Sequence, residues 1–198
     1  MKYFSFLLLL IIGCQKSEIR SENNSVEAAE VPYKEFLISV NKKPEKEKKE
    51  YFFKFINDDI PNYWISTPWS FDGTSRDPKK GSIACGYFVT NILADYGFKI
   101  KRIYLAQQAS SVMIKQLCKE IQYFSKREDV DQYVLKKNKN QVYMVGLDFH
   151  TGFITRENKD TYFIHSNYIN NKGVVKEMTK NSQALNASKT FMIGTLNY

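Results

Sequence analysis

The chain has 198 residues, with 29 lysines and arginines against 21 aspartates and glutamates, and a formal net charge of +8. A hydrophobic share of 43% is enough for a packed core and excludes a disordered chain. The three cysteines, at positions 14, 85 and 118, are too few for a disulfide scaffold, and no two have zinc-ligand spacing. The charge bias suits an anionic membrane or cell-wall surface. Nucleic acid is not an expected partner, because the basic residues are interleaved with acidic ones and no nucleic-acid-binding motif appears.

The N-terminus has the features of an export signal. Lys2 gives a short basic start, residues 4–12 are apolar apart from Ser5, and Gly13-Cys14 follows. The run is too short for a spanning helix but suits a signal peptide. These features resemble a bacterial lipoprotein signal, in which cleavage precedes a cysteine that becomes lipidated. The alternative is an ordinary secretory signal with a chance cysteine.

The lipoprotein resemblance implies a definite organisation of the N-terminus. Residues 1–13 are then the signal peptide, Cys14 carries the lipid, and the polar residues 14–31 are a flexible tether. The protein is expected to be anchored to a bacterial membrane through this lipid. We expect the outer membrane, with the domain facing the periplasm or the cell surface.

Residues 32–62 are expected to form an N-terminal helical extension to a domain over 63–198. Within it, a short helix is predicted over 33–40. A second helix is predicted from the charged residues 42–50 through the apolar residues that follow, ending at Pro61.

The segment 62–81 is rich in proline and glycine and holds both tryptophans, Trp64 and Trp69. Because an aromatic loop directly before a helix often lines a site, at least one tryptophan is expected beside the next helix. That helix is predicted over 83–96, with Ser82 as its N-cap and Gly97 in the left-handed position after its end.

Two further helices and then a set of strands are predicted. One apolar face predicts a helix over 110–121, and residues 126–139 predict a helix and a loop. From Gln141 the apolar period changes to two. Strands are predicted over 142–147, 152–155, 161–165, 173–176 and 190–196, with a hairpin turn at Asn158-Lys159-Asp160. Helices followed by an antiparallel meander define an α+β fold.

One cysteine and two histidines are the candidate reactive groups. Cys85 lies at the start of the 83–96 helix, where the helix dipole favours the thiolate over the thiol, and a nearby histidine lowers the thiol pKa further. His150 and His165, the only histidines, both lie in the strand region. Cys118 is expected inside the 110–121 helix as a buried neutral thiol. A helical cysteine is more often a small core residue than a nucleophile, so this pattern alone does not decide the function.

Three local sequences narrow the choice of function for Cys85 and the two histidines. They are Trp69-Ser70-Phe71-Asp72-Gly73-Thr74 followed by Ala84-Cys85-Gly86-Tyr87, then His150-Thr151-Gly152-Phe153-Ile154, and finally Phe163-Ile164-His165-Ser166. In this order they resemble the motifs of the NlpC/P60 cysteine peptidases, a family with a papain-like α+β fold that cleaves peptide bonds in bacterial cell-wall stem peptides. The chain departs from the family's Asp-Cys-Ser-Gly at residues 84–87, and it has Trp69 where the family usually has tyrosine.

The resemblance implies a cell-wall-directed cysteine hydrolase that needs no cofactor and no metal. It assigns catalysis to Cys85 as nucleophile, His150 as base and His165 as the orienting group. It assigns substrate binding to four residues: Trp64, Trp69, Gly73 and Gly86. The expected substrates are peptidoglycan stem peptides.

Two other functions fit the same residues. An acyltransferase or transglutaminase-like enzyme would share the nucleophile, and it would need an acidic residue after the histidine, for which the sequence offers Glu157 and Asp160. A non-catalytic wall-binding lipoprotein could keep the fold and pair Cys85 with Cys118 in a disulfide.

Overall fold

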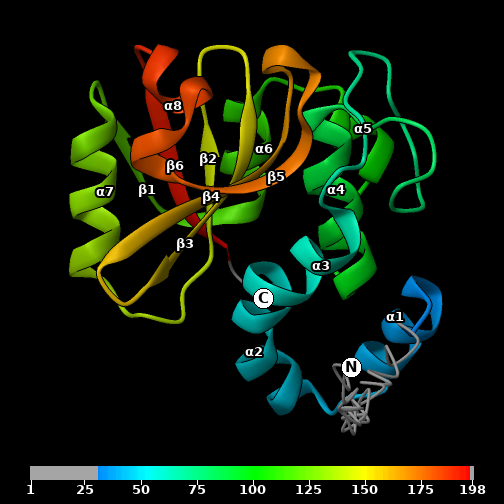
Figure 1. Ribbon diagram of the computed structural model, residues 1–198. Helices are drawn as coiled ribbons and strands as arrows, with labels where there is room; N and C mark the ends of the chain where they lie inside the picture. Colours follow the sequence, from blue (N-terminus) through cyan, green and yellow to red (C-terminus); the bar gives the residue numbers. More distant parts are fainter. Residues whose placement is uncertain (1–30, 197–198) are drawn as a thin grey trace, which may run out of the picture. The chain divides into compact units, whose positions relative to one another are not determined.

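Six antiparallel strands form a sheet in the computed structural model, which describes residues 31–196 (Figure 1). The strand order is β1-β6-β2-β3-β4-β5, so that β2 to β5 form a meander and β6 lies between β1 and β2. The strands are β1 (Cys118–Phe124), β2 (Tyr143–Gly146), β3 (Thr151–Glu157), β4 (Asp160–Asn167), β5 (Gly173–Met178) and β6 (Phe191–Leu196). The predicted α+β class is confirmed.

Helices precede the sheet and also lie between its strands. They are α1 (Tyr33–Asn41), α2 (Glu45–Lys54), the π-helical η1 (Phe55–Asp59), α3 (Ile60–Trp64), α4 (Cys85–Tyr96), α5 (Arg102–Ala106), α6 (Ser110–Leu117), α7 (Arg127–Lys136) and α8 (Gln183–Ala187). Two short 3₁₀ turns, η2 (Ile169–Asn171) and η3 (Thr179–Asn181), flank β5. In residues 31–196 no helix is both long and apolar enough to span a membrane.

The sheet has a hydrophobic core on each face, because neighbouring residues of a strand point to opposite sides. Helices α3, α4 and α6 contact one face, and α7 contacts the other, as Figure 1 shows. Met144 and Phe153 belong to the core on the α4 side, whereas their neighbours Val145 and Ile154 belong to the core on the α7 side. The sheet is therefore buried on both faces.

The N-terminal helices share the core on the α4 side. The Phe36 ring stacks on Phe55 at a centroid distance of 5.9 Å, and Phe55 lies 4.5 Å from the Tyr96 ring at the end of α4. The Tyr33 hydroxyl donates a hydrogen bond to the Asp95 carboxylate at 2.9 Å. The extension 32–62 therefore supports the helix that begins with Cys85.

Several local expectations are confirmed. Helices form at 33–41 and 127–136, all five predicted strands are present, and Gly97 has φ of 108° after α4. The predicted hairpin turn joins β3 to β4, where Glu157 pairs with Asp160 and Asn158 has φ of 53°.

Three local expectations are wrong. Pro61 does not end the N-terminal helices, because it lies in the first turn of α3, where an amide proton is not needed. Ser82 does not cap α4: the N-cap is Ala84, without a side-chain bond, and Ser82 Oγ contacts Ser70 Oγ instead. The 110–121 helix ends at Leu117, because the residues after it pair with β6 as the edge strand β1.

Candidate active site

Cys85 is the first residue of α4, and the backbone before it is held on three sides. Ala84 N donates to Gly73 O at 2.9 Å, and Ile83 N donates to Pro68 O at 2.9 Å. Ser166 on β4 donates its hydroxyl to Ile83 O at 2.6 Å. The start of α4 is thus joined directly to the strand that carries His165.

Both predicted substrate-binding glycines are sites of close backbone approach. A Cβ at Gly73 would lie 2.6 Å from Ile83 N, and a Cβ at Gly86 would lie 2.3 Å from Ala106 O. Gly73 therefore holds the segment before the helix. Gly86 lets α5 approach the first turn of α4, and it also lines the cavity beside Cys85.

The two histidines meet at the ends of neighbouring strands. His150 directly precedes β3, and His165 lies on β4. His150 Nε2 is 2.7 Å from His165 Nδ1, and both rings are buried. A Cβ at Gly152 would lie 2.7 Å from His165 Cβ and 2.8 Å from Ile164 O, so glycine at this position lets β3 approach β4 closely beside His165.

A third group, Glu177 on β5, completes the chain of hydrogen bonds. Its Oε1 is 3.1 Å from His165 Nε2. Burial raises the pKa of Glu177, but hydrogen bonds from His165 and Ser182 outweigh it, and the net pKa is lowered. Glu177 is therefore a carboxylate at neutral pH and acts only as an acceptor.

The donor and acceptor roles follow from that carboxylate. Because Glu177 accepts, His165 Nε2 carries the proton, and Nδ1 of this neutral ring accepts from His150 Nε2. This leaves His150 with an unprotonated Nδ1. Among residues 31–196 that nitrogen has no hydrogen-bond partner, so its lone pair is available as a base.

Both imidazoles are neutral at pH 7. Burial lowers the pKa of His150 well below its ordinary value, and the neighbouring His165 lowers it further. Burial also lowers the pKa of His165, although the hydrogen bond to Glu177 partly offsets the decrease. The contact between His165 and Glu177 is thus a hydrogen bond from a neutral ring rather than a salt bridge.

The expectation of a depressed thiol pKa at Cys85 is wrong. Burial raises the pKa of this thiol, and hydrogen bonds from the backbone N–H groups of Thr151, Gly86 and Cys85 itself offset only part of the increase. The N–H of Thr151 places the sulfur beside the residue that follows His150. The raised pKa favours a neutral thiol at Cys85, and the lowered pKa favours a neutral imidazole at His150, which lines the same cavity.

This charge state predicts how the thiol responds to pH. Alkylation of Cys85 by iodoacetamide is expected to be slow at pH 6 and to accelerate only above about pH 8.5, since the thiolate is the nucleophile and the ordinary thiol pKa is about 8.5. Alkylated peptides can be quantified by mass spectrometry across this pH range. Rapid labelling at pH 6 that does not change with pH would instead indicate a stable thiolate–imidazolium pair.

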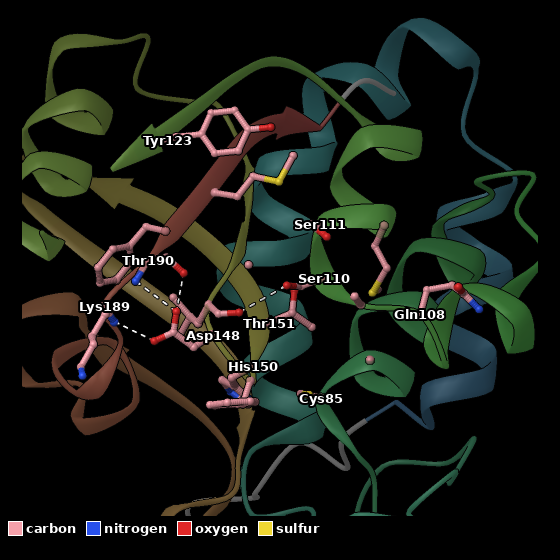
Figure 2. A pocket seen from close by; sticks show the side chains of 18 of the residues that line it. Cys85, Gln108, Ser110, Ser111, Tyr123, Asp148, His150, Thr151, Lys189 and Thr190 are labelled. Carbon is pink, nitrogen blue, oxygen red and sulfur yellow. Dashed lines mark hydrogen bonds between the residues drawn. The ribbon is translucent and has the colours of Figure 1, made fainter. Parts of the chain in front are cut away.

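A cavity of about 980 Å³ adjoins Cys85 and His150 (Figure 2). It is lined by the segment from the end of α5 to α6, the end of β1, the turn between β2 and β3, and the start of β6. Figure 2 shows Cys85 and His150 at one end and Tyr123 of β1 at the other. The site therefore has room for an extended group next to the sulfur.

Asp148 fixes the turn that carries His150. Its carboxylate accepts hydrogen bonds from Lys189 N at 2.8 Å and Thr190 N at 3.1 Å, and a short one from the Thr190 hydroxyl (Figure 2). Leu147 N also donates to His150 O at 2.8 Å across the turn. The turn is thus attached to the segment that leads into β6.

Neither tryptophan is among the residues that line this cavity. Trp64 is fully buried in the core on the α4 side, so the expectation of substrate contact is wrong for it. Trp69 is half-buried and lies 6.2 Å from the Tyr168 ring, whose centroid is 5.1 Å from that of His150. Trp69 therefore lies next to Tyr168, a neighbour of His150, and not in the cavity itself.

The remaining candidates lie apart from the histidines. Glu157 bonds Asn57 and Lys176, and Asp160 approaches Lys180, so neither supplies an acid to His150 or His165. Cys85 and Cys118 are both free thiols. Cys118 lies on β1 rather than in a helix, and burial raises its thiol pKa to about 12. Cys14 lies outside the described residues.

Sequence reasoning missed Glu177, although a signal for it exists. The sequence predicts a strand that ends at residue 176, whereas β5 continues to Met178. His165 pairs with Val175, so Glu177, two residues further on, lies on the same face as His165. An acidic residue at this spacing on the strand next to a histidine predicts the contact.

No family model, no curated protein and no solved structure matches this chain. Within residues 31–196, no group of three or more histidine, cysteine, aspartate or glutamate side chains is arranged to hold a metal ion. The thiol, the two histidines and Glu177 are therefore the features of the described chain that bear on its function.

Proposed function

We propose that this protein is a cysteine hydrolase that cleaves amide bonds in peptidoglycan stem peptides. The observation that carries the proposal is the arrangement at Cys85. The thiol of Cys85, at the start of α4, lies against Thr151, the residue after His150. His150 is hydrogen bonded to His165, and His165 is hydrogen bonded to Glu177. Nucleophile, base and orienting group in this order are the elements of a thiol-dependent acyl transfer.

The proposed reaction begins with the neutral pair. As Cys85 Sγ attacks the carbonyl carbon, His150 Nδ1 takes the thiol proton, and the carbonyl oxygen becomes an oxyanion near the start of α4. The N–H groups of Cys85 and Gly86, which contact the sulfur in the resting state, can then donate to the oxyanion. When the oxyanion collapses, the C–N bond breaks and His150 returns the proton to the leaving amine. Water then cleaves the thioester, with His150 taking the water's proton and giving it to the sulfur.

The proposed fold family and the proposed location next to the cell wall rest on the sequence resemblance. The nucleophile helix comes before the two histidine strands in the chain, and the sheet is antiparallel, which supports a papain-like fold of the NlpC/P60 type. The lipoprotein-like N-terminus supports attachment to a membrane through Cys14, next to the cell wall. Membrane fractionation of a Cys14→Ser chain tests the anchor, since loss of the lipid is expected to move the protein to the soluble fraction.

Digestion of purified muropeptides tests the function. The full chain in detergent is expected to release fragments whose masses correspond to hydrolysis of one amide bond, detected by mass spectrometry. Addition of a primary amine distinguishes transfer from hydrolysis, because an acyltransferase would give amine-modified products. If no fragment appears while Cys85 is free and the protein is folded, the cell-wall assignment is wrong.

A further inference from the structure

The cavity beside Cys85 crosses one end of the sheet from β3 to β1. Its lining includes one residue from each of four neighbouring strands: Thr151 of β3, Gly146 of β2, Met192 of β6 and Tyr123 of β1. Each is the register partner of the next, because Thr151 pairs with Gly146, Gly146 with Met192, and Met192 with Tyr123. Directly opposite residues lie on the same face of a sheet, so the four form one row across the strands.

The length of this row follows from the spacing of strands. The row begins beside the nucleophile, because the Thr151 N–H contacts the Cys85 sulfur. Neighbouring strands lie about 4.8 Å apart, so the three steps from Thr151 to Tyr123 cover about 14 Å. An extended peptide advances about 3.4 Å per residue, and about four residues therefore fit along the row. Figure 2 shows Cys85 and Tyr123 at opposite ends of the cavity.

The two sides of the row are formed by different elements. On one side lies the start of α6, which approaches β2 closely because a Cβ at Gly146 would lie 2.5 Å from Ser110 Oγ. On the other side lie the turn between β2 and β3 and the start of β6 (Figure 2). Phe149 and Lys189 on this side are exposed, so the cavity is open to solvent. A peptide with charged side chains can lie along it and keep those groups in water.

Tyr123 has the properties of a binding residue rather than of a packing residue. Its side chain is 66% exposed, and within residues 31–196 it makes no hydrogen bond and no ring contact. The next residue, Phe124, instead packs against Tyr133 at a centroid distance of 5.6 Å. A tyrosine ring offers a large contact area and a hydroxyl group, and ordering it costs little conformational entropy.

We infer that the protein recognises its substrate over about 14 Å on one side of the cleaved bond, and that Tyr123 binds the substrate group at the far end of this stretch. The inference rests on the proposed function, because it takes Cys85 as the nucleophile and a stem peptide as the substrate. Tyr123 is then a specificity-determining residue that selects long substrates over short ones. Binding energy from a part of the substrate remote from the reacting atoms raises kcat/KM.

Substrates of graded length test the inference. The parent is the purified muropeptide that the full chain in detergent cleaves, and the probes are synthetic copies shortened by one residue or one sugar at a time from each end. On one side of the cleaved bond, kcat/KM is expected to fall about tenfold when the group about 14 Å away is removed. Removal of groups beyond that point is expected to change kcat/KM by less than about twofold.

Substitutions of tyrosine identify the residue that reads this length. Tyr123→Ala is expected to lower kcat/KM for the parent about tenfold and to leave it within about twofold for the copy that lacks the distant group, because that copy does not reach position 123. Tyr123→Phe keeps the ring and is expected to stay within about threefold of the wild-type chain. Tyr104→Ala is the matched control, since Tyr104 is also an exposed tyrosine, lies on α5 and does not line the cavity. It is expected to keep kcat/KM for the parent within about twofold.

A binding measurement separates this inference from the proposed function. Calorimetry with Cys85→Ala measures the affinity for the muropeptide without turnover, and adding Tyr123→Ala is expected to weaken it about tenfold. Cleavage that depends on Cys85 but is insensitive to Tyr123→Ala at every substrate length would overturn the inference and leave the hydrolase in place. Binding that Tyr123→Ala weakens, without cleavage by the intact chain, would support the extended site and overturn the hydrolase. If the folded chain neither cleaves nor binds the muropeptide, both are wrong.

Discussion

His150→Ala is expected to lower kcat/KM for the hydrolysed bond by about a thousandfold or more. The resting thiol is protonated, because burial raises its pKa, so the attack depends on a base that removes the proton. His150 Nδ1 is the nitrogen free to do so, and general-base catalysis contributes about 10²–10⁴-fold. Steady-state rates on the muropeptide that the wild-type chain turns over measure the loss.

Substitutions of cysteine provide the matched comparison. Cys85→Ala is expected to abolish both turnover and the acyl-enzyme, whereas Cys118→Ala makes the same change at the other described free thiol and is expected to leave the rate within about twofold.

His165→Ala is expected to leave partial activity, because an orienting group contributes less than the base. Full activity of His150→Ala would remove the catalytic assignment and favour a binding protein on this fold.

The nucleophile helix and the histidine strands were predictable from the sequence because their signals are local. Apolar periodicity and Gly97 determine where α4 lies and ends, and alternation determines β3 and β4. Cys85 and the two histidines were therefore assigned to the correct elements. Their contact with one another depends on strand order, which local patterns do not contain.

The errors come from tertiary pairing. Residues 118–124 continue the apolar spacing of α6, but they become a strand because β6 offers an edge to pair with. The strand is irregular, with a register shift between Lys119 and Gln122 and a φ of 49° at Glu120, so a period of two is not visible in the sequence. Tertiary context overrides the local preference here.

The prediction of a lowered thiol pKa at Cys85 is wrong for a related reason. Helix position and a neighbouring histidine are visible in the sequence, and both favour the thiolate. Burial depends on how α5, α6 and the turn before β3 close around the sulfur, and it has the larger effect. The sequence identified the reactive group, whereas its protonation state depended on packing.

Glu177→Gln is expected to lower kcat/KM about tenfold and to change the tautomers of the two histidines. The carboxylate only accepts, so it keeps the proton of His165 on Nε2 and, through the pair, leaves His150 Nδ1 unprotonated. A glutamine side chain offers a donor as well as an acceptor at the same place. A hydrogen bond to a charged group is also worth about 1 kcal/mol more than a neutral one, and 1.36 kcal/mol corresponds to tenfold in rate.

Two readouts distinguish this positioning role from a general loss of stability. Nitrogen NMR of the imidazoles is expected to show protonation at Nε2 in both rings of the wild-type chain and a mixture in Glu177→Gln. Because the hydrogen bond to Glu177 raises the pKa of His165, its loss is expected to move the acid limb of the pH–rate profile to lower pH.

Glu157→Gln makes the same change at an ion pair with Lys176 away from the histidines, and it is expected to leave the tautomers and the acid limb unchanged. Identical histidine spectra in Glu177→Gln and the wild-type chain would show that the carboxylate does not set the proton positions.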